Sequence, residues 1–358
     1  MSRVTVVIPN YNGLRFMEPC MSALKAQTYT DFCVLIVDNG STDGSVEWIS
    51  SLMDEKENGD ARTLPGIRAI LLKDNTGFAG AVNVGIEYAD SELVLLLNND
   101  TEPEPDFMAA LIEAFDKEGN ERLFAASPMM IQLYHKELLD DAGDGFCLLG
   151  WAFQRGVGRP VSDAKFSRGC SVFSACAGAS MYRRDMLEAL AIKGSRSYEG
   201  IGGETYTCRE YFDTEHFAYL EDLDLSFRAR TEGYDIRYVP KARVFHVGSG
   251  TSGSKYNSFK VRLAARNNIW LCWKNMPILM LIINLPFILL GILIKLMFFR
   301  KRGFGRDYVK GLKEGLAGIR SCRKKYFRMS RLGYYIGTEL RMIADTFSYA
   351  GDLIRRKL

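Results

Sequence analysis

Four short polar loops in the first third of the chain carry side chains that could bind a polar ligand. The loops are Pro9–Asn12, Asp38–Asp43, Asp74–Phe78 and Asn98–Thr101, and each comes directly after an apolar run. Asn, Asp, Ser and Gly are also common in turns and helix caps, so one such loop has an ordinary structural explanation. Four loops with the same placement predict one shared binding crevice.

The loop Asn98–Thr101 contains one acidic residue, Asp100, directly after two asparagines. An isolated carboxylate among amide oxygens is a hard-oxygen site that suits Mg²⁺ or Mn²⁺, and such an ion commonly takes its other ligands from phosphates. His246, one of three histidines, lies in a glycine-rich stretch after an apolar run and could supply a second ligand. The alternative is a histidine that bonds only to a backbone carbonyl.

A second acidic feature is the pair Glu221 and Asp222, at the start of the helical pattern Asp222–Glu232. Acidic residues in a first helical turn commonly stabilise the helix dipole. The other interpretation is a general base that the helix start directs into the crevice, with apolar neighbours that raise its pKa. These residues alone leave both interpretations open.

The loops require a frame of buried strands with helices between them. Four apolar runs lack polar alternation, which indicates parallel strands covered on both faces: Val4–Ile8, Val34–Val37, Ile67–Leu72 and Leu93–Leu97. Helical periodicity separates them, as in Met17–Leu24 and Phe107–Phe115. This alternation predicts a doubly wound α/β sheet, in which ligands bind at the carboxyl ends of the strands.

The middle of the chain is less regular. Residues 140–215 are rich in Gly, Ser and Tyr, and we expect long loops over the site, with one strand near Ser171–Met181 and a helix from Arg184. A further helix is expected at Asp222–Glu232 and a strand at Ile236–Val239.

Two common nucleotide-binding motifs are absent from the sequence. No GxGxxG follows the first predicted strand, and Asn75–Gly80 matches that motif only in part, after the third. The pattern GxxxxGK[ST] does not occur. Because these motifs carry the phosphate contacts of Rossmann dehydrogenases and P-loop kinases, both classes are excluded.

Seven motifs together resemble one enzyme family in order and spacing: Val7–Asn12, Val37–Ser45, Asn75–Gly80, Leu96–Thr101, Gly178–Met181, Tyr219–Leu225 and Val239–His246. The chain resembles family 2 glycosyltransferases of the GT-A fold, a Rossmann-like, mostly parallel sheet. Within that family it looks most like bacterial rhamnosyltransferases of O-antigen and cell-wall polysaccharide synthesis. The resemblance covers about residues 3–270.

The resemblance implies a role for each matching position. The nucleotide would be held by Pro9, Tyr11, Asn12, Asp38, Asn75, Gly77 and Phe78, with Asp38 on the base. The donor and metal motif would be Asn98, Asn99 and Asp100, with the metal held by Asp100 and His246. The catalytic base would be Asp222 with its neighbour Glu221, and Gly178 and Glu221 would line the acceptor side.

Two departures from the family pattern bear on these roles. The usual DxD motif is here Asn98-Asn99-Asp100, so one carboxylate replaces two and metal binding would depend more on His246. The glycine-rich stretch before the acidic pair is replaced by the longer segment Gly194–Phe217, at the place where an acceptor would be recognised.

The reaction implied is a single inverting displacement, dependent on a divalent metal. The expected donor is dTDP-rhamnose and the expected acceptor a hydroxyl of a lipid-linked glycan. UDP-galactofuranose, UDP-glucose and UDP-N-acetylhexosamine are alternative donors. A catalytically dead membrane scaffold of a polysaccharide-assembly complex is a non-enzyme alternative, which intact Asp100, Asp222 and His246 disfavour.

The near-neutral net charge of +3 conceals two oppositely charged parts. Residues 1–259 carry 25 basic and 38 acidic side chains, whereas residues 260–358 carry 21 basic and five acidic. A strong local charge of this kind selects partners. We therefore expect a catalytic domain at residues 1–270 and a basic, membrane-associating helical region at residues 271–358. Eight cysteines without a CxxC pair, and an N-terminus without a secretory signal, favour the cytoplasmic face of the membrane.

The uncharged run Met276–Ile294 is long enough to span a bilayer as a helix. Asn284, Pro286, the nearby Lys295 and basic flanks favour a kinked in-plane or re-entrant anchor instead; a single span and a buried core helix are alternatives.

Beyond this run, an apolar stripe at Val309, Leu312, Leu316 and Ile319 lies among basic residues, as in helices on anionic membranes. A solvated helix packed on its own domain is the alternative. We expect residues 276–325 to contact an anionic membrane surface. The basic residues contain no nucleic-acid-binding module, so nucleic acid is not expected, and the oligomeric state is left open.

Overall fold

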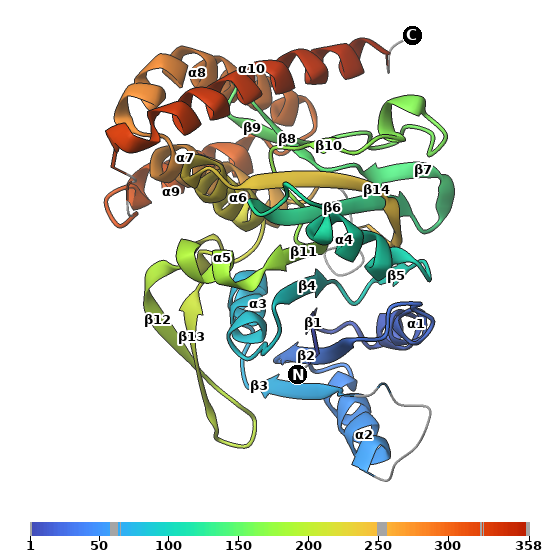
Figure 1. Cartoon of the computed structure of the whole chain (residues 1–358). Coiled ribbons are helices and arrows are strands. Elements are labelled where there is room, and N and C mark those ends of the chain that lie inside the picture. The colour runs from blue at the N-terminus through green and yellow to red at the C-terminus, as the bar shows by residue number, and fades with distance from the viewer. Residues whose placement is uncertain are drawn as a thin grey trace.

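A computed structural model describes residues 2–57, 64, 66–248, 256–322, 324 and 326–355. Its centre is a ten-stranded sheet (Figure 1). The main strand order is β10 (Cys170–Ser171), β14 (Asp235–His246), β6 (Leu123–Gln132), β11 (Ala179–Arg183), β4 (Leu93–Leu97), β1 (Val4–Asn10), β2 (Phe32–Asn39) and β3 (Arg68–Leu72). Strands β4, β1, β2 and β3 run parallel, and β11 is antiparallel to both its neighbours. The predicted α/β class and GT-A-like sheet are confirmed.

The four N-terminal strands form where the apolar runs predict them because both of their faces are covered. All five residues of β4 are fully buried. In β1, Val7 belongs to one core and Val6 and Ile8 to another on the opposite face. Helix α3 (Gly77–Glu87) packs closely on β1, because Gly85 leaves no room for a Cβ, which would lie 2.2 Å from Val7. The other helices between these strands are α1 (Leu14–Lys25), α2 (Ser45–Glu57) and α4 (Phe107–Asp116).

The middle of the chain differs from the expectation of long loops and one strand. Residues 171–181 do not form a single strand; β10 ends at Ser171 and β11 begins at Ala179. Residues 140–215 contain two hairpins, β8 (Asp144–Cys147) with β9 (Trp151–Gln154), and β12 (Ile192–Glu199) with β13 (Thr205–Glu210). Strand periodicity does not reveal β12 and β13 because most of their described side chains are partly or fully exposed. Helices α5 (Arg184–Leu190) and α6 (Glu221–Glu232) form as predicted.

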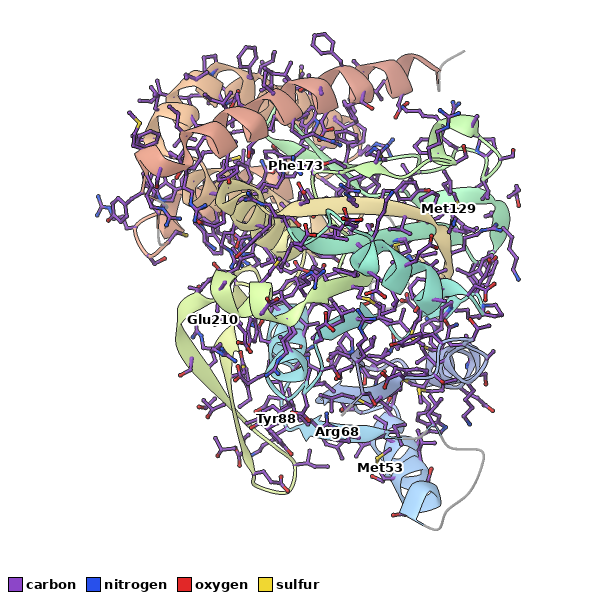
Figure 2. All side chains as sticks on the ribbon, viewed as in Figure 1. Met53, Arg68, Tyr88, Met129, Phe173 and Glu210 are labelled. Atoms are coloured by element: carbon purple, nitrogen blue, oxygen red, sulfur yellow. The ribbon has the colours of Figure 1, made fainter. Side chains whose placement is uncertain are left out.

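Four longer helices follow the sheet: α7 (Ser258–Asn275), α8 (Ile278–Lys301), α9 (Gly305–Gly318) and α10 (Leu332–Arg355). They lie together beside α6, β8 and β9, at the opposite end of the molecule from β3 (Figure 1). Phe173, labelled in Figure 2, belongs to a core that also includes Phe227 of α6, Leu271 of α7 and Met342 of α10. Helix α7 runs through residue 270, so the two parts share a core at the border; their separation into domains remains a prediction.

Helix α8 is the one helix of the described residues that is long and apolar enough to cross a membrane. It is continuous through Pro286. Asn284 and Lys295, the two polar residues that disfavour a membrane span in the sequence, both face the protein. Asn284 is fully buried and donates to Glu339 of α10 at 2.8 Å, while the Lys295 ammonium lies 4.9 Å from the ring centre of Trp151. The outer side of α8 is consequently apolar, with residues such as Leu279, Ile282 and Leu289 more than half exposed.

Candidate active site

The loops after β1 and β2 are joined by a buried hydrogen-bond network. Asn10 donates to the Asp38 carboxylate at 2.7 Å and accepts from Asn99 at 2.6 Å, so it links the loops after β1, β2 and β4. The other Asp38 oxygen accepts from the Ser41 amide at 2.9 Å. Asp38 is fully buried and both its oxygens are occupied within the protein. Its visible contribution is to hold the loop, and the predicted contact with a nucleotide base remains a prediction.

Residues 9–12 extend this network to the surface. Asn12 has φ of 51°, a left-handed conformation, and its side-chain oxygen accepts from the Thr42 amide at 2.7 Å. Tyr11 is 37% exposed. Pro9 lies beside Val37 in the parallel ladder of β1 and β2. The first two polar loops are therefore brought together as the sequence predicts.

The third polar loop contacts the turn before α6. Asn39 donates to Asn75 at 3.1 Å and to the Gly77 carbonyl at 3.1 Å, which fixes the loop to β2. Gly77 has φ of 77°, and a Cβ there would lie 2.6 Å from the Phe217 carbonyl oxygen. Only glycine allows this approach without strain. Phe78 is partly buried against the core below the loop.

The fourth polar loop places Asp100 beside His246. Short strand β5 (Thr101–Pro103) pairs with the end of β14, with Thr101 opposite His246. The nearest nitrogen of His246, Nε2, is 3.4 Å from an Asp100 oxygen. Gly178, just before β11, lies beside Asn98, because the Asn98 backbone amide donates to the Gly178 carbonyl at 2.8 Å. Two residues far apart in sequence, Asp100 and His246, thus meet as predicted.

A third residue completes this group. Nδ1 of His246 lies 2.7 Å from a carboxylate oxygen of Asp140, at the end of β7 (His135–Asp141). Burial lowers the pKa of His246, but hydrogen bonds to Asp100 and Asp140 outweigh burial and raise the pKa to about 10. A carboxylate oxygen and an imidazole nitrogen, with a second carboxylate on the other ring nitrogen, form a donor set that fits Mn²⁺ or Mg²⁺. Without an ion the imidazole is a cation at neutral pH, and a divalent ion would take the place of the proton on Nε2, so the residues present fit such an ion.

The acidic pair follows a strained turn. Phe217, Tyr219 and Leu220 have φ values of 62°, 70° and 70°, which non-glycine residues rarely adopt. Each such residue costs on the order of 1–3 kcal/mol, and strain of this kind is concentrated at functional sites. The turn directs Glu221 and Asp222 into the first turn of α6, where Asp222 accepts from the Leu223 amide at 2.8 Å.

One side chain of α7 holds the strained turn. The Asn267 amide nitrogen lies 3.0, 2.9 and 2.8 Å from the carbonyl oxygens of His216, Ala218 and Tyr219. Asn267 is fully buried, and its neighbour Arg266 donates to the Glu215 and His216 carbonyls. These bonds compensate the strain, so α7 positions the acidic pair.

Replacing Asn267 with Ala should release this turn. The carbonyls of Ala218 and Tyr219 would lose this donor, whereas the His216 carbonyl keeps Arg266, and leaving a buried polar group unpaired costs about 1–3 kcal/mol. We expect turnover to fall by ~10–100-fold and donor affinity to fall less, because only the third of the four polar loops contacts this turn, at Gly77. The measurement is steady-state kinetics of the variant and the wild type, in which kcat and the KM for the donor are determined separately. Asn268→Ala on the same helix is the matched control, since no described residue partners its side-chain oxygen; equal losses in both variants would refute the positioning role.

A carboxylate and a thiol that the sequence did not reveal lie near Asp222. Asp144 and Cys176 have ligand atoms within 4.8 Å of one from Asp222 and of each other. Burial raises the pKa of Asp144 well above its usual range, and Asp141 and Asp222 add to this. Burial also raises the pKa of Asp222. The signal was the acidic, glycine-containing run Asp140–Gly145 after a strand, which we assigned to loops.

Glu221 is buried without a partner for one of its oxygens, Oε2, among the described residues. Burial, with a smaller contribution from Asp222, raises its pKa to about 8. The folded chain therefore holds a proton on Glu221 that the unfolded chain releases near the usual value of a Glu. Stability should fall as pH rises between these two pKa values, because the folded state there binds more protons.

Replacing Glu221 with Gln should remove this pH dependence. The amide mimics the protonated acid, so the variant should match the wild type near pH 5 and exceed it by on the order of 4 kcal/mol near pH 9. The measurement is the melting temperature of both proteins across that range. A difference that is constant with pH would show that Glu221 does not titrate as described.

Another acidic group, Asp213, His216 and Asp224, has ligand atoms within 4.8 Å of one another. The Lys274 ammonium forms ion pairs with both Asp213 and Asp224, so a cation of the chain already occupies this place. Asn275 also donates to Asp224 at 2.7 Å. The group therefore joins α6 to α7, and the Lys274 ammonium stands where a metal ion would bind.

Comparison with known proteins now identifies the class. The sequence profile of Glycosyl transferase family 2 matches residues 5–191, over half of the chain. The chain belongs to glycosyl transferase family 2.

Individual relatives are distant. An uncharacterized glycosyltransferase of Nostoc sp. is 28% identical over 138 residues, 38% of this chain and 38% of that protein. Glycosyltransferase GlyG of Streptococcus pneumoniae is 24% identical over 170 residues, 46% of this chain and 52% of that protein. A teichoic acid poly(glycerol phosphate) polymerase of Staphylococcus epidermidis is 32% identical over 102 residues, 28% and 13% of the two chains. The chain spans about half or less of these relatives.

Solved structures extend the likeness to the whole chain. Residues 1–349 of S. aureus TarS in complex with UDP-GlcNAc match with a TM-score of 0.55 and 14% identity, over 99% of this chain and 92% of that one. The mannosyltransferase PcManGT of Pyrobaculum calidifontis, in complex with GDP-Man and Mn²⁺, matches with a TM-score of 0.50 and 15% identity. This match covers 100% of this chain and 88% of that one. At these identities the likeness establishes the GT-A fold. The finer resemblance to rhamnosyltransferases stays a prediction.

Proposed function

We propose that this protein is an inverting glycosyltransferase that uses a nucleotide-sugar donor. The observation that carries the proposal is the partly buried Asp222 of a family 2 chain, which follows a strained turn in contact with the third polar loop. Burial raises the pKa of Asp222 and makes it a stronger base. No covalent nucleophile is required, because one displacement suffices.

The proposed reaction begins at the acceptor hydroxyl. Asp222 takes the hydroxyl proton as the oxygen attacks the anomeric carbon, and the bond from that carbon to the diphosphate breaks on the opposite face, which inverts the stereocentre. Asp100 and His246 would hold a Mn²⁺ or Mg²⁺ ion, with Asp140 orienting the imidazole. Such an ion, when bound, neutralises charge on the departing nucleoside diphosphate. The loops at Pro9, Tyr11, Asn12, Asn75, Gly77 and Phe78 would hold the nucleotide.

The donor is the least constrained part of the proposal. We propose dTDP-rhamnose, on the motif resemblance. UDP-linked sugars are the alternative, and the structural neighbours are described with UDP-GlcNAc and GDP-Man.

A thermal-shift screen of nucleoside diphosphates and nucleotide sugars, with and without Mn²⁺, tests the proposal. A ligand that binds only the folded state raises the melting temperature. The correct donor should do so in the presence of Mn²⁺ and should be slowly hydrolysed. A higher melting temperature with dTDP but not with UDP would favour dTDP-rhamnose as the donor. If no nucleotide sugar raises the melting temperature or is hydrolysed, the proposal is wrong and the catalytically dead membrane scaffold is the alternative that stands.

We further propose a lipid-linked glycan acceptor of a cell-surface polysaccharide, at the cytoplasmic face of an anionic membrane. Support comes from the bare apolar side of α8 and from the cell-wall polymer named for one relative. Of the membrane-contacting range 276–325, residues 323 and 325 lie outside the described residues. Removing residues 276–358 would strip the core around Phe146 and Phe227, so point variants of the full chain are the better test.

A further inference from the structure

A basic groove of about 760 Å³ lies where α8 ends and α9 begins. Arg300 from α8 and Arg306, Lys310 and Lys313 from α9 line it, together with the apolar side chains of Leu296 and Val309. All four basic side chains are exposed. Gly303, with φ of 84°, makes the turn that brings the two helices together. Four cations from two helices thus surround one hollow.

The groove keeps a net positive charge. None of the four cations forms an ion pair with a residue that the structure describes. Helix α9 carries two acidic side chains, Asp307 between Arg306 and Lys310, and Glu314, which accepts from Arg262 of α7 at 2.7 Å, so the cations of the groove outnumber the nearby acids. Unpaired cations around a hollow suit a ligand with phosphate oxygens.

The groove lies at the end of an apolar surface. Leu293 and Met297, two turns and one turn before Arg300, are 51% and 50% exposed, and Phe298 is 37% exposed. Apolar side chains followed within one turn by cations match the order of acyl chains and phosphates in a bilayer. This order distinguishes a lipid headgroup from a free anion, which would need no apolar border.

The groove is also connected to the catalytic turn. The ring of Tyr256 packs against Phe298 and Phe299 at 5.8 and 5.9 Å between centres. Three residues later, Phe259 packs against Phe217, the first residue of the strained turn. These ring contacts connect the apolar end of α8 to the turn that precedes Asp222.

We propose that Arg300, Arg306, Lys310 and Lys313 form a docking groove for the phosphates of anionic phospholipids. The inference rests on the proposed membrane-side function and names its contact. Docking there anchors the chain at the membrane. The outer face of α8 would then lie against the acyl chains, and the turn Phe217–Leu220 would face the lipid surface.

Vesicle binding of the full-length protein tests this proposal. The variant Arg306→Gln/Lys310→Gln/Lys313→Gln is compared with Lys25→Gln/Lys117→Gln/Lys241→Gln, which changes the net charge equally at exposed positions of the first 259 residues. Vesicles of phosphatidylcholine with about one quarter phosphatidylglycerol are the probe. Because each cation near such a surface contributes about tenfold or somewhat less, the groove variant should bind ~100-fold more weakly and the control nearly as well as the wild type.

The outcomes separate the alternatives. Equal losses in both variants would mean that net charge alone matters, and no loss in the groove variant would mean that its cations do not contact lipid; either result overturns the groove. Inorganic pyrophosphate that displaces the protein more than sodium chloride of equal ionic strength would identify a free-anion site and also overturn it. Hydrolysis of nucleotide sugars by the same preparations reports the proposed catalytic function separately, since the groove variant leaves Asp222 and Asp100 intact.

Discussion

Replacing Asp222 with Asn should reduce sugar transfer by a factor of ~10²–10⁴, the usual contribution of a positioned general base. The amide keeps the shape of the side chain and can still accept from the Leu223 amide, but it cannot take a proton from the acceptor. Donor affinity should change little, because the polar loops after β1, β2, β3 and β4 do not use Asp222. The measurement is steady-state transfer together with the thermal shift that the donor produces.

A control is needed because Asp222 lies among other buried acids. Asp144→Asn removes a neighbouring carboxylate within 4.8 Å without removing the proposed base. It should retain transfer to within about tenfold and leave the pH profile nearly unchanged, because burial keeps the Asp144 carboxyl protonated and its replacement by an amide then removes no charge. Near-wild-type transfer by Asp222→Asn, or a loss in Asp144→Asn as large as that in Asp222→Asn, would contradict the assignment of Asp222 as the base.

The sequence was informative wherever a structural requirement acts on neighbouring residues. Strand β4 must be apolar at every position because helices cover both of its faces, so Leu93–Leu97 could be recognised directly. The polar loops follow such strands at once, and their meeting at one sheet edge is a consequence of parallel order. The same reasoning placed Asp222 at a helix start.

Contacts between distant segments could not be predicted in this way. Asn267 reads as an ordinary helix residue, and only the fold places it against the carbonyls of residues 216–219. Asp140 reaches His246 because β7 and β14 both pair with β6, a register that no local pattern encodes. Likewise, Asn284 and Lys295 argued against a span by composition, whereas the structure turns both toward the protein.

Replacing Asp100 with Asn should weaken Mn²⁺ binding by at least ~10–100-fold, with transfer falling in parallel. Asp100 is the one carboxylate of its motif, and Asn98 and Asn99 offer neutral oxygens only. The Asn99 side chain is moreover held in place through its nitrogen, which donates to Asn10. The measurement is Mn²⁺ affinity by electron paramagnetic resonance in the presence of a nucleoside diphosphate, which reports the metal independently of turnover.

Two variants distinguish a ligand from a general charge effect. Asp106→Asn removes an exposed carboxylate at the start of α4 and should leave Mn²⁺ affinity unchanged. Asp140→Asn should weaken Mn²⁺ binding less than Asp100→Asn, because Asp140 contacts the histidine through Nδ1 and leaves Nε2 toward Asp100. Unchanged Mn²⁺ affinity in Asp100→Asn would place the metal elsewhere, and the group Asp144, Cys176 and Asp222 would then be the next site to vary.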